Sequence, residues 1–341
     1  MTPSRPRSGT RVTIKDVAGR AGVSAMTVSN VFNGTGKFSQ ETRERVLSAI
    51  RELGYVPNSA AQRLVGSVPA RIGFLYADVE SMFINAALAA IAVAAAERGL
   101  QVVARRAVSA RDALDAARDL ARSGVDALLL LPPFDGILSG SAALAGLNLA
   151  TASIATAAPL PDMITVRIDN RSASRAATEL LIGGGRRRIA VIAGPLDHSD
   201  SVERLAGYRE ALVAHGLRAD PALCVEGHFT FASGLLAAEH LLGLPEPPDA
   251  IVAANDDMAA AALLAAHRRG LSLPRDLAVT GFDDTLLATR VWPPLTTVRQ
   301  PIDVMAARAL DLLLDRLRRP RADAPPADIL ESYTLVQRGS T

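Results

Sequence analysis

The sequence predicts an α/β protein with a small all-α head and a two-lobed core built from two parallel sheets flanked by helices. Two observations support this fold class. Three short helical segments lie between Ile14 and Leu53, and strand-like and helical segments then alternate from Arg71 almost to the end of the chain. Alternation of this kind is typical of parallel sheets covered by helices. A chain of 341 residues is long enough for two such units beside a small head.

Charge is distributed unevenly along the chain. Residues 1–66 contain ten basic and four acidic residues, a net charge of +6, which leaves −4 for the remainder because the whole chain carries +2. A basic head on a mildly acidic body predicts that a polyanion binds at one end only.

Composition indicates a soluble protein of a reducing compartment. Hydrophobic residues make up 49% of the chain, and the single Cys224 excludes a disulfide framework. Residues 1–11 are polar and rich in proline and arginine, so we expect a disordered basic arm and no signal peptide. No segment has the length and apolarity of a membrane span. We therefore expect a cytoplasmic, nucleoid-associated protein with no membrane partner.

Residues 12–56 predict a helix-turn-helix domain. Helices are expected at 14–21 and 25–32, and a third helix begins at Ser39 and ends at Gly54. Such a three-helix bundle is small and is typical of a DNA-reading head.

The turn between the first two helices rests on three residues. Ala18 must be small because the second helix packs over it, Gly22 can adopt a left-handed conformation, and Val28 packs the second helix onto the first. Ser24 can cap the second helix. The outward side chains of that helix are short and polar and can reach base edges in a major groove: Thr27, Ser29, Asn30 and Asn33. An ordinary helical hairpin is the alternative, and the basic charge of the head favours DNA binding.

Residues 57–69 follow as a linker. The overlapping segment YVPNSAAQRLVGS, residues 55–67, contains Pro57, which can start a short helix, but an isolated helix of two turns is not stable in water. The segment is either a plain linker or a hinge that folds only when DNA and a second subunit hold it.

The core, residues 70–341, alternates strands and helices. Strands are expected at 71–76, 101–104, 126–131, 149–154, 164–168, 188–193, 223–226, 249–253 and 277–281, with a last strand in YTLVQR. Helices are expected at 83–98, 109–123, 172–183, 201–215, 231–242, 256–269 and 301–318. Ligands bind such sheets off the carboxyl ends of the strands.

The helix expected at 83–98 has almost no polar face. It reads FINAALAAIAVAAAER, whereas an outer helix on a sheet should present polar residues to water. We therefore expect one face to be buried on the sheet and the other in a homodimer interface.

Signals for catalysis or metal binding are weak. Gly183-Gly184-Gly185 precedes a strand and does not follow one, so these residues form a helix-end turn and no phosphate cradle. The five histidines lack metal-ligand spacing, and no nucleophile-elbow motif is present. We expect no enzyme activity, no catalytic residue, no metal and no cofactor.

Motifs along the whole chain resemble the lactose-repressor (LacI/GalR) family of transcriptional regulators. They are TIKDVA, AGVS, TVSNVFNG, RERVLSAIRELGYVPN, VRIDN, RRIAVIAGP, ERLAGYREAL, AAND, GFDD, PPLTTVRQP and VQRGST, and they cover Thr13 to Thr341. The resemblance implies a dimer on a palindromic operator, with the second helix of each head in the major groove and a hinge helix whose leucine, here Leu64, wedges into the minor groove.

The resemblance also assigns candidate residues. The DNA-binding candidates are Thr13, Ser24, Ala25, Met26, Thr27, Ser29, Asn30, Asn33, Tyr55, Asn58, Arg63 and Leu64. Many family members carry a basic residue where Asn30 stands, so an amide contact to adenine replaces an arginine–guanine contact. Ala25 and Met26 offer only apolar contact.

For the core, the resemblance implies a periplasmic-binding-protein-like fold whose chain crosses three times between the lobes. Lobe one is expected at 70–167 plus 299–326, and lobe two at 168–298 plus 327–341. The effector between the lobes is expected to be a small polar metabolite, sugar-like or nucleoside-like. Its candidate contacts are Phe83, Asp169, His198, Asp200, Arg204, Phe229, Asn255 and Asp283.

Structural roles are the alternative for three of these residues: Asp283 as a cap, Arg204 as a surface cation and Phe229 as core. Departures from the family pattern fall around the same site. Ile84 stands where a second aromatic residue is common, and Ser153-Ile154-Ala155 stands where an acidic residue is common. His228 replaces an aspartate that many members carry before Phe229.

We therefore predict a ligand-responsive DNA-binding regulator, a repressor in the simplest case. Two other functions are the alternatives: a solute-binding protein without a DNA role, and a sugar-modifying enzyme.

Overall fold

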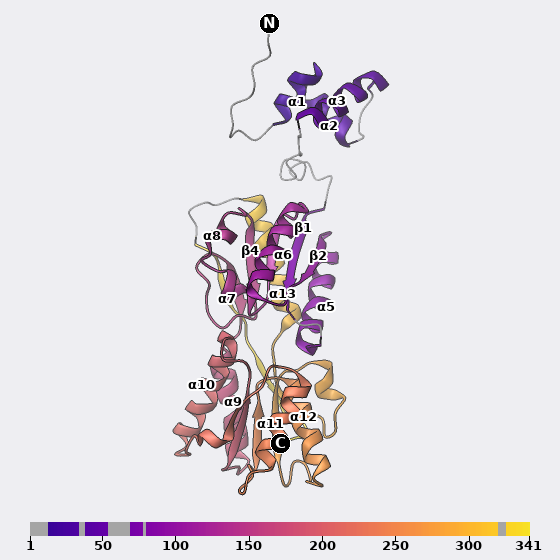
Figure 1. The fold of residues 1–341 in the computed structure, drawn as a ribbon. Coiled ribbons are helices and arrows are strands. Elements are labelled where there is room, and N and C mark those ends of the chain that lie inside the picture. Colours follow the sequence, from indigo (N-terminus) through magenta and orange to yellow (C-terminus); the bar gives the residue numbers. More distant parts are fainter. Residues whose placement is uncertain (1–12, 34–37, 54–68, 78–79, 320–324) are drawn as a thin grey trace. The chain divides into compact units, whose positions relative to one another are not determined.

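The computed structural model describes residues 13–33, 38–53, 69–77, 80–319 and 325–341, apart from the side chains of residues 32, 33 and 51. The chain divides between Val68 and Pro69 into two compact units, which are described separately (Figure 1). This division agrees with the predicted start of the core at residue 70. The expected basic arm and most of the expected hinge lie outside the described residues.

The head contains the three expected helices, α1 (Ile14–Ala21), α2 (Ala25–Asn33) and α3 (Gln40–Leu53). Val17, Val28 and Val46 are buried where the three helices meet. Gly22 adopts φ 66°, and its left-handed conformation ends α1. The turn chemistry predicted from the sequence is therefore confirmed.

Six parallel strands form the sheet of lobe one, in the order β11-β5-β4-β3-β1-β2. These are β1 (Arg71–Tyr76), β2 (Gln101–Arg106), β3 (Ala127–Leu130), β4 (Ala150–Ile154), β5 (Ile164–Arg167) and β11 (Asp328–Leu330). Helices α5 (Met82–Glu97) and α13 (Ile302–Arg318) cover one face. Helices α6 (Ala110–Arg122), α7 (Phe134–Leu138) and α8 (Ala142–Ala145) cover the other face.

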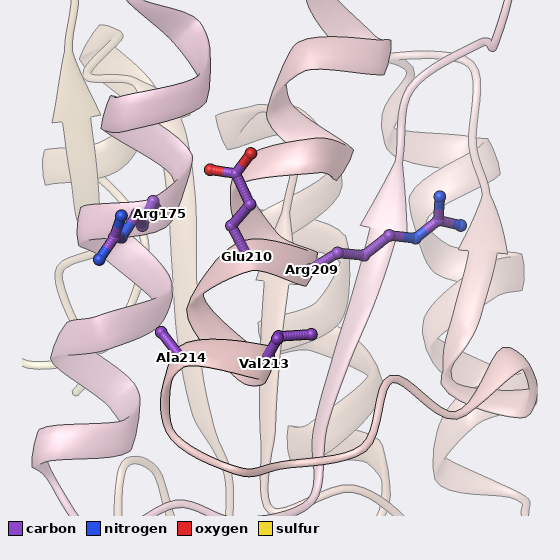
Figure 2. A pocket seen from close by; sticks show the side chains of 5 residues that line it. All are labelled: Arg175, Arg209, Glu210, Val213 and Ala214. Carbon is purple, nitrogen blue, oxygen red and sulfur yellow. The ribbon is translucent and has the colours of Figure 1, made fainter.

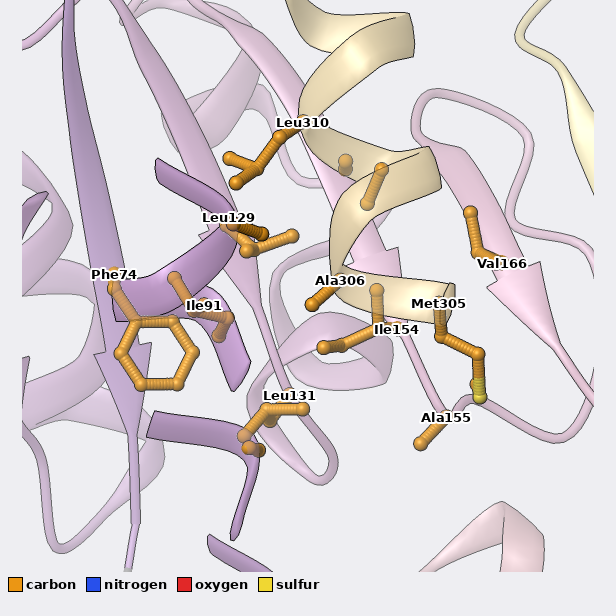
Figure 3. Close-up of a cluster of buried hydrophobic side chains, with 14 of the residues drawn as sticks. Phe74, Ile91, Leu129, Leu131, Ile154, Ala155, Val166, Met305, Ala306 and Leu310 are labelled. Atoms are coloured by element: carbon orange, nitrogen blue, oxygen red, sulfur yellow. The ribbon is translucent and has the colours of Figure 1, made fainter. Parts of the chain in front are cut away.

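Alternate strand residues point into the core beneath α5 and α13. Figure 3 shows Phe74 and Leu129 of the sheet facing Ile91 of α5, with Met305 and Leu310 of α13 beside them. All five side chains are at most 1% exposed. The opposite set of strand residues packs under α6, as expected for a sheet covered on both faces.

Lobe two has a second six-stranded sheet, in the order β12-β10-β9-β8-β6-β7. Its strands are β6 (Ile189–Ala193), β7 (Cys224–Glu226), β8 (Ala250–Ala253), β9 (Ala278–Asp283), β10 (Thr296–Arg299) and β12 (Thr334–Val336), of which only β12 pairs in an antiparallel manner. Helices α9 (Asn170–Gly183) and α10 (Ser199–Ala214) cover one face, and α11 (Phe231–Leu242) and α12 (Asp256–Arg268) the other. Short 3₁₀ turns lie at Pro221–Leu223 and Leu286–Thr289.

The third crossing between the lobes differs from the prediction. Lobe one was expected to end at residue 326, but β11 pairs with β5 in the first sheet and only β12 joins the second. The Asp328 carboxylate accepts from Arg167 Nε at 2.9 Å and from Thr165 Oγ1 at 2.6 Å, which fixes β11 beside β5. The crossing therefore follows Leu330.

Candidate functional site

Polar residues of lobe two gather where its strands end. Asp200 follows β6 on the first turn of α10, Asn255 follows β8, and Asp283 is the last residue of β9. All three are less than 9% exposed. The carboxyl edge of a parallel sheet thus gathers groups from segments far apart in the sequence, as expected for a ligand site of this fold class.

Arg204 of α10 lies at the centre of this cluster and is 5% exposed. Its Nε donates to Asn170 Oδ1 at 2.9 Å, and its Nη1 donates to the carbonyl oxygen of Ala254 at 2.6 Å. The guanidinium carbon lies 3.8 Å from the centroid of the Phe282 ring, a cation–π arrangement. Arg204 is therefore no surface cation, because protein groups hold its guanidinium on several sides.

Two carboxylates share this guanidinium. Asp200 Oδ2 lies 3.4 Å from Nη2 of Arg204, and Asp283 Oδ1 lies 3.8 Å from Nη1. Gln300 Nε2 also donates to Asp283 Oδ1 at 2.8 Å. Burial raises the pKa of Asp283 well above its ordinary range, and the charge of Arg204 opposes this only in part.

Backbone conformations that side chains rarely adopt lie at the strand ends of both lobes. Ala155 follows β4 with φ 64°, Phe229 lies in the loop after β7 with φ 58°, and Asp283 and Asp284 at the end of β9 have φ 106° and 52°. Strain of this kind persists where the surrounding structure enforces it, and it is common at ligand sites.

Phe229 forms an apolar wall beside Arg204. Its ring centroid lies 5.6 Å from that of His198 and 5.9 Å from the guanidinium carbon. A Cβ at Gly194 would overlap the Phe229 ring, so only glycine allows this approach. Asn255 Nδ2 donates to the Phe229 carbonyl oxygen at 2.9 Å, while its Oδ1 caps α12 through Met258 N.

Two groups of lobe one interact with residues of lobe two near this cluster: the backbone N–H of Met82 and the carboxyl group of Asp135. The backbone N–H of Met82, at the start of α5, donates to Asp257 Oδ2 of α12 at 3.3 Å, which is a direct contact between the lobes. Asp135 on α7 accepts from Ser153 Oγ at 2.6 Å and from Gly136 N at 2.7 Å. Burial is the main cause that raises the pKa of Asp135, and the charge of Asp200 in the other lobe raises it further.

In the head, the predicted base-reading side chains of α2 differ in how far they are exposed to solvent. Met26 is 73% exposed, whereas Ala25 is half-buried against the head core. Ser24 Oγ accepts from Thr27 N at 3.1 Å and lies 2.9 Å from Thr27 Oγ1, so Ser24 caps α2 as predicted.

Other DNA candidates have structural partners or lie outside the described part of the chain. The Thr13 hydroxyl donates to Asp16 Oδ2 at 2.7 Å in the cap of α1. Ser29 and Asn30 are half-buried on α2. The side chain of Asn33 and all of Tyr55, Asn58, Arg63 and Leu64 fall outside the described residues.

Comparison with known proteins decides the family. Residues 13–58 match bacterial regulatory proteins of the lacI family, and residues 178–341 match a periplasmic binding protein-like domain. The HTH-type transcriptional regulator CelR of Thermobifida fusca is 38% identical over 333 residues, which cover 96% of this chain and 98% of CelR. The chain belongs to the LacI family. The HTH-type transcriptional repressor CytR of Escherichia coli (strain K12) is 35% identical over 336 residues, 97% of each chain.

Solved structures of LacI-family proteins share the fold. A CelR–cellobiose complex is 35% identical with a TM-score of 0.71, and it covers 97% of this chain and 100% of its own. The lac repressor dimer bound to operator and the anti-inducer ONPF is 29% identical with a TM-score of 0.72, over 97% and 99% of the two chains. This LacI-family protein is thus a transcriptional regulator with a DNA-binding head and a periplasmic-binding-protein-like core, and its relatives are regulators and not enzymes.

The structure of this LacI-family protein brings six of the eight predicted effector residues together: His198, Asp200, Arg204, Phe229, Asn255 and Asp283. Asp169 instead caps α9, since its carboxylate accepts from Ser172 N at 2.9 Å and from Ser172 Oγ at 2.7 Å. Phe83 is half-buried against the core of lobe one.

Three residues of the cluster were not among the candidates: Asn170, Asp135 and Gln300. Asn170 is the residue after Asp169. The VRIDN motif therefore located the correct turn, but Asn170 and not Asp169 is the residue that contacts Arg204. Gln300 lies in the motif PPLTTVRQP at the second crossing between the lobes. Asp135 carried no sequence signal that distinguishes it from a surface aspartate.

An open depression of about 400 Å³ lies elsewhere, on the outer side of α9 and α10 (Figure 2). It is lined by Arg175, Arg209, Glu210, Val213 and Ala214. None of these residues belongs to the polar cluster, and the depression is shallow and solvent-facing. We assign it no role in the function of this LacI-family protein.

Proposed function

We propose that this chain is a repressor that binds a palindromic operator as a homodimer and responds to a small polar metabolite bound between the lobes of its core. The observation that carries the proposal is the buried polar cluster around Arg204. The same chain also has a head with helix-turn-helix geometry. The alternatives of a solute-binding protein and a sugar-modifying enzyme do not fit the relatives, which are transcriptional regulators.

On DNA, we propose that the exposed side of α2 lies in the major groove. Thr27, Ser29 and Asn30 then select the bases, and Met26 makes apolar contact with a thymine methyl. Most of the affinity comes from contacts between DNA phosphates and the basic residues around the helix. Phosphate contacts position the protein on the DNA, whereas base contacts select the sequence. We place this activity in the cytoplasm, where the DNA lies.

The effector is proposed to be sugar-like or nucleoside-like. A neighbouring structure is a cellobiose complex, and relatives include the ribose operon repressor of Escherichia coli (strain K12). Closure of the lobes on the ligand would act on the Met82–Asp257 contact at the start of α5. A ligand that favours one lobe arrangement shifts the population of the DNA-competent dimer.

Operator binding is tested by gel shift with the full chain and with residues 69–341. The full chain should bind a palindromic site, with an affinity that falls steeply with salt because bound cations are released from DNA. The truncated chain lacks the head and should not bind. Equal binding by both chains would refute the DNA role of the head.

Leu64→Ala tests the proposed hinge. The resemblance to the family makes Leu64 the minor-groove wedge, so its truncation should weaken operator binding by roughly tenfold or more through lost contact area. The melting temperature of the core should stay unchanged because residue 64 lies in the other unit. Wild-type operator affinity in this variant would remove Leu64 from the interface.

Val93→Glu tests the proposed dimer helix. The exposed residues of α5 include Ala89, Ala92, Val93 and Ala96, and Val93 is 60% exposed in the single chain. A carboxylate there would be buried without a partner in the dimer, so the dissociation constant should rise by roughly a hundredfold or more. Sedimentation at micromolar concentration should then show a monomer.

Val213→Glu is the matched control for the dimer test. Val213 is also a helical valine, 71% exposed, but it lies on α10 in lobe two. Its substitution should leave the dimer intact. A dimeric Val93→Glu variant, or dissociation by both substitutions, would contradict an interface on α5.

A further inference from the structure

Helix α5 is anchored at its two ends to different lobes. At its carboxyl end, Arg98 Nε and Nη2 donate to the two carboxylate oxygens of Asp311 on α13, at 2.7 and 2.9 Å. Arg98 Nη1 also donates to the Ala94 carbonyl oxygen of α5 at 2.9 Å. Both helices lie on the sheet of lobe one. The carboxyl end of α5 therefore moves with lobe one.

The amino end of α5 is held from lobe two. The backbone N–H of Met82, the first residue of the helix, donates to Asp257 Oδ2 of α12 at 3.3 Å. The first N–H groups of a helix have no acceptor within the helix, and the helix dipole favours a negative charge beside them. Ser81 Oγ accepts from Ile84 N at 3.4 Å, but the first turn of α5 contains no acidic residue of its own. The negative charge at this helix end therefore comes from the other lobe.

Asp257 is buried and closely held within lobe two. It is 6% exposed and lies in the first turn of α12, whose cap is a different residue, Asn255. A Cβ at Gly234 of α11 would lie only 2.5 Å from Met258 Cα, so α11 and the start of α12 are in close contact. The start of α12 has little room to shift within its lobe. A change in the distance between Asp257 and Met82 therefore requires movement of one lobe against the other.

We propose that the Asp257 carboxylate is a latch between the lobes. It completes the cap of α5 while the lobes stand as they do in this structure, and it leaves α5 when the lobes separate. Asp257 is thus a positioning residue, because it acts through α5 and needs no contact with a ligand. A carboxylate at the amino end of a helix shifts an equilibrium by roughly twofold to thirtyfold, so the latch favours the observed arrangement of the lobes before any ligand binds.

The latch also connects the arrangement of the lobes to the proposed dimer helix. The amino end of α5 loses its second anchor when the lobes separate, and the exposed residues of the same helix are those that we place in the homodimer interface. A change within one core thereby reaches the partner subunit and the heads. This connection rests on the proposed function, whereas the latch itself concerns the core alone.

A role confined to lobe two is the alternative for Asp257, since an acidic residue in the first turn also favours its own helix, α12. Hydrogen exchange of the full chain without ligand, resolved to single residues by mass spectrometry, distinguishes the two roles. Asp257→Ala should raise the exchange rate of the Met82 N–H roughly tenfold, because that N–H loses its acceptor. Asp257→Asn should give an intermediate rate, because the amide oxygen still accepts but carries no charge.

Asp112→Ala is the matched control for the exchange measurement. Asp112 lies in the first turn of α6, and its Oδ2 accepts from the backbone N–H of Val108 at 2.8 Å, but both residues belong to lobe one. This variant should raise the exchange rate at Val108 and leave the rate at Met82 unchanged.

Met82→Pro removes the latch from the side of lobe one. Proline is favoured at the first position of a helix, and Ser81 before it has φ −68° and ψ 123°, an extended conformation that is compatible with a following proline. The substitution removes the N–H donor and leaves Asp257 in place, so it remains informative if Asp257→Ala does not fold. Met82→Ala is its matched control, because it shortens the same side chain but retains the N–H.

Operator affinity without ligand measures the connection to the heads. It should change roughly threefold or more in Met82→Pro and in Asp257→Ala, and less than twofold in Met82→Ala. The double variant of Met82→Pro and Asp257→Ala should show no further change, because both substitutions remove the same hydrogen bond.

A wild-type exchange rate at Met82 in Asp257→Ala would overturn the inference, as would equal operator affinities of Met82→Pro and Met82→Ala. Failure of the wild-type chain to bind a palindromic operator would instead contradict the proposed function. The exchange comparison uses no DNA, so it would still decide whether Asp257 latches the lobes.

Discussion

Gly207→Ala is expected to lower the melting temperature of the core by roughly 6 to 12 °C, which corresponds to about 3 kcal/mol of stability. Gly207 lies in the middle of α10, at the closest approach to α9. A Cβ there would overlap the carbonyl oxygen of Arg171 and lie 2.9 Å from the backbone N of Arg175. Both obstacles are backbone atoms of a helix, so the strain can be relieved only if the helices separate.

Separation of these helices should also damage the polar cluster. Asn170 stands at the start of α9 and Arg204 on α10, and their hydrogen bond of 2.9 Å spans the two helices. We therefore expect a weaker ligand-induced rise in melting temperature in Gly207→Ala, in addition to the loss of stability.

Gly183→Ala controls for the loss of glycine itself. Gly183 is the exposed last residue of α9 and has nothing within 4 Å of an added Cβ. Alanine is the better helix former by roughly 1 kcal/mol, so this variant should be as stable as the wild type or slightly more stable. A Gly207→Ala protein with the melting temperature of Gly183→Ala would show that α9 and α10 tolerate a wider spacing.

The sequence predicted those features that depend on local chemistry. Gly22, Ala18 and Val28 specify a turn within a few residues, and the structure confirms all three. Seven helices of the core were predicted to within two residues of their ends, whereas the short helices α7 and α8 were not predicted. Strands β10 and β11 were not predicted. Each is only three or four residues long, and β11 pairs with β5, which lies far earlier in the chain.

The candidate site was predictable only where a motif fixed the residue. Asp169 and Asn170 show that a motif can locate a turn without identifying which side chain enters the site. The helix was expected to begin at residue 172, but α9 begins at Asn170, so Asp169 becomes the cap and Asn170 faces Arg204. Asp135 could not be found in this way, because its role depends on the packing of α7 against β4 and on Asp200 in the other lobe.

Arg204→Ala is expected to destabilise the core by about 3 to 5 kcal/mol and to abolish the ligand-induced rise in melting temperature. The variant leaves Asp200 and Asp283 buried without their shared cation. Arg204→Lys keeps the charge, but an ammonium group cannot reproduce the planar contacts with Asn170, Ala254 and Phe282. We expect Arg204→Lys to be more stable than Arg204→Ala and still to respond poorly to ligand.

Arg171→Ala is the matched control for Arg204→Ala. Arg171 also pairs with two carboxylates, Glu203 at 2.7 Å and Glu210 at 3.2 Å, but its side chain is 46% exposed. Exposed ion pairs contribute about 1 kcal/mol or less, so this variant should lose little stability and should keep its ligand response. Equal losses in the two variants would show that Arg204 acts as an ordinary ion-pair partner.

The pH dependence separates loss of charge pairing from loss of packing in Arg204→Ala. Burial already raises the pKa of Asp283 in the folded state, so the folded protein binds a proton there more tightly than the unfolded chain. The resulting stability is fully present below the unfolded pKa of about 3.9 and is lost as the pH rises through the folded pKa.

Removal of Arg204 takes away the charge that lowers this pKa, so the variant should lose more stability than the wild type as the pH rises. The difference in unfolding free energy between the two proteins should therefore shrink as the pH is lowered through the interval between their folded-state pKa values for Asp283. A difference that stays constant over this range would mean that lost packing against Phe282, and not an unpaired carboxylate, destabilises the variant.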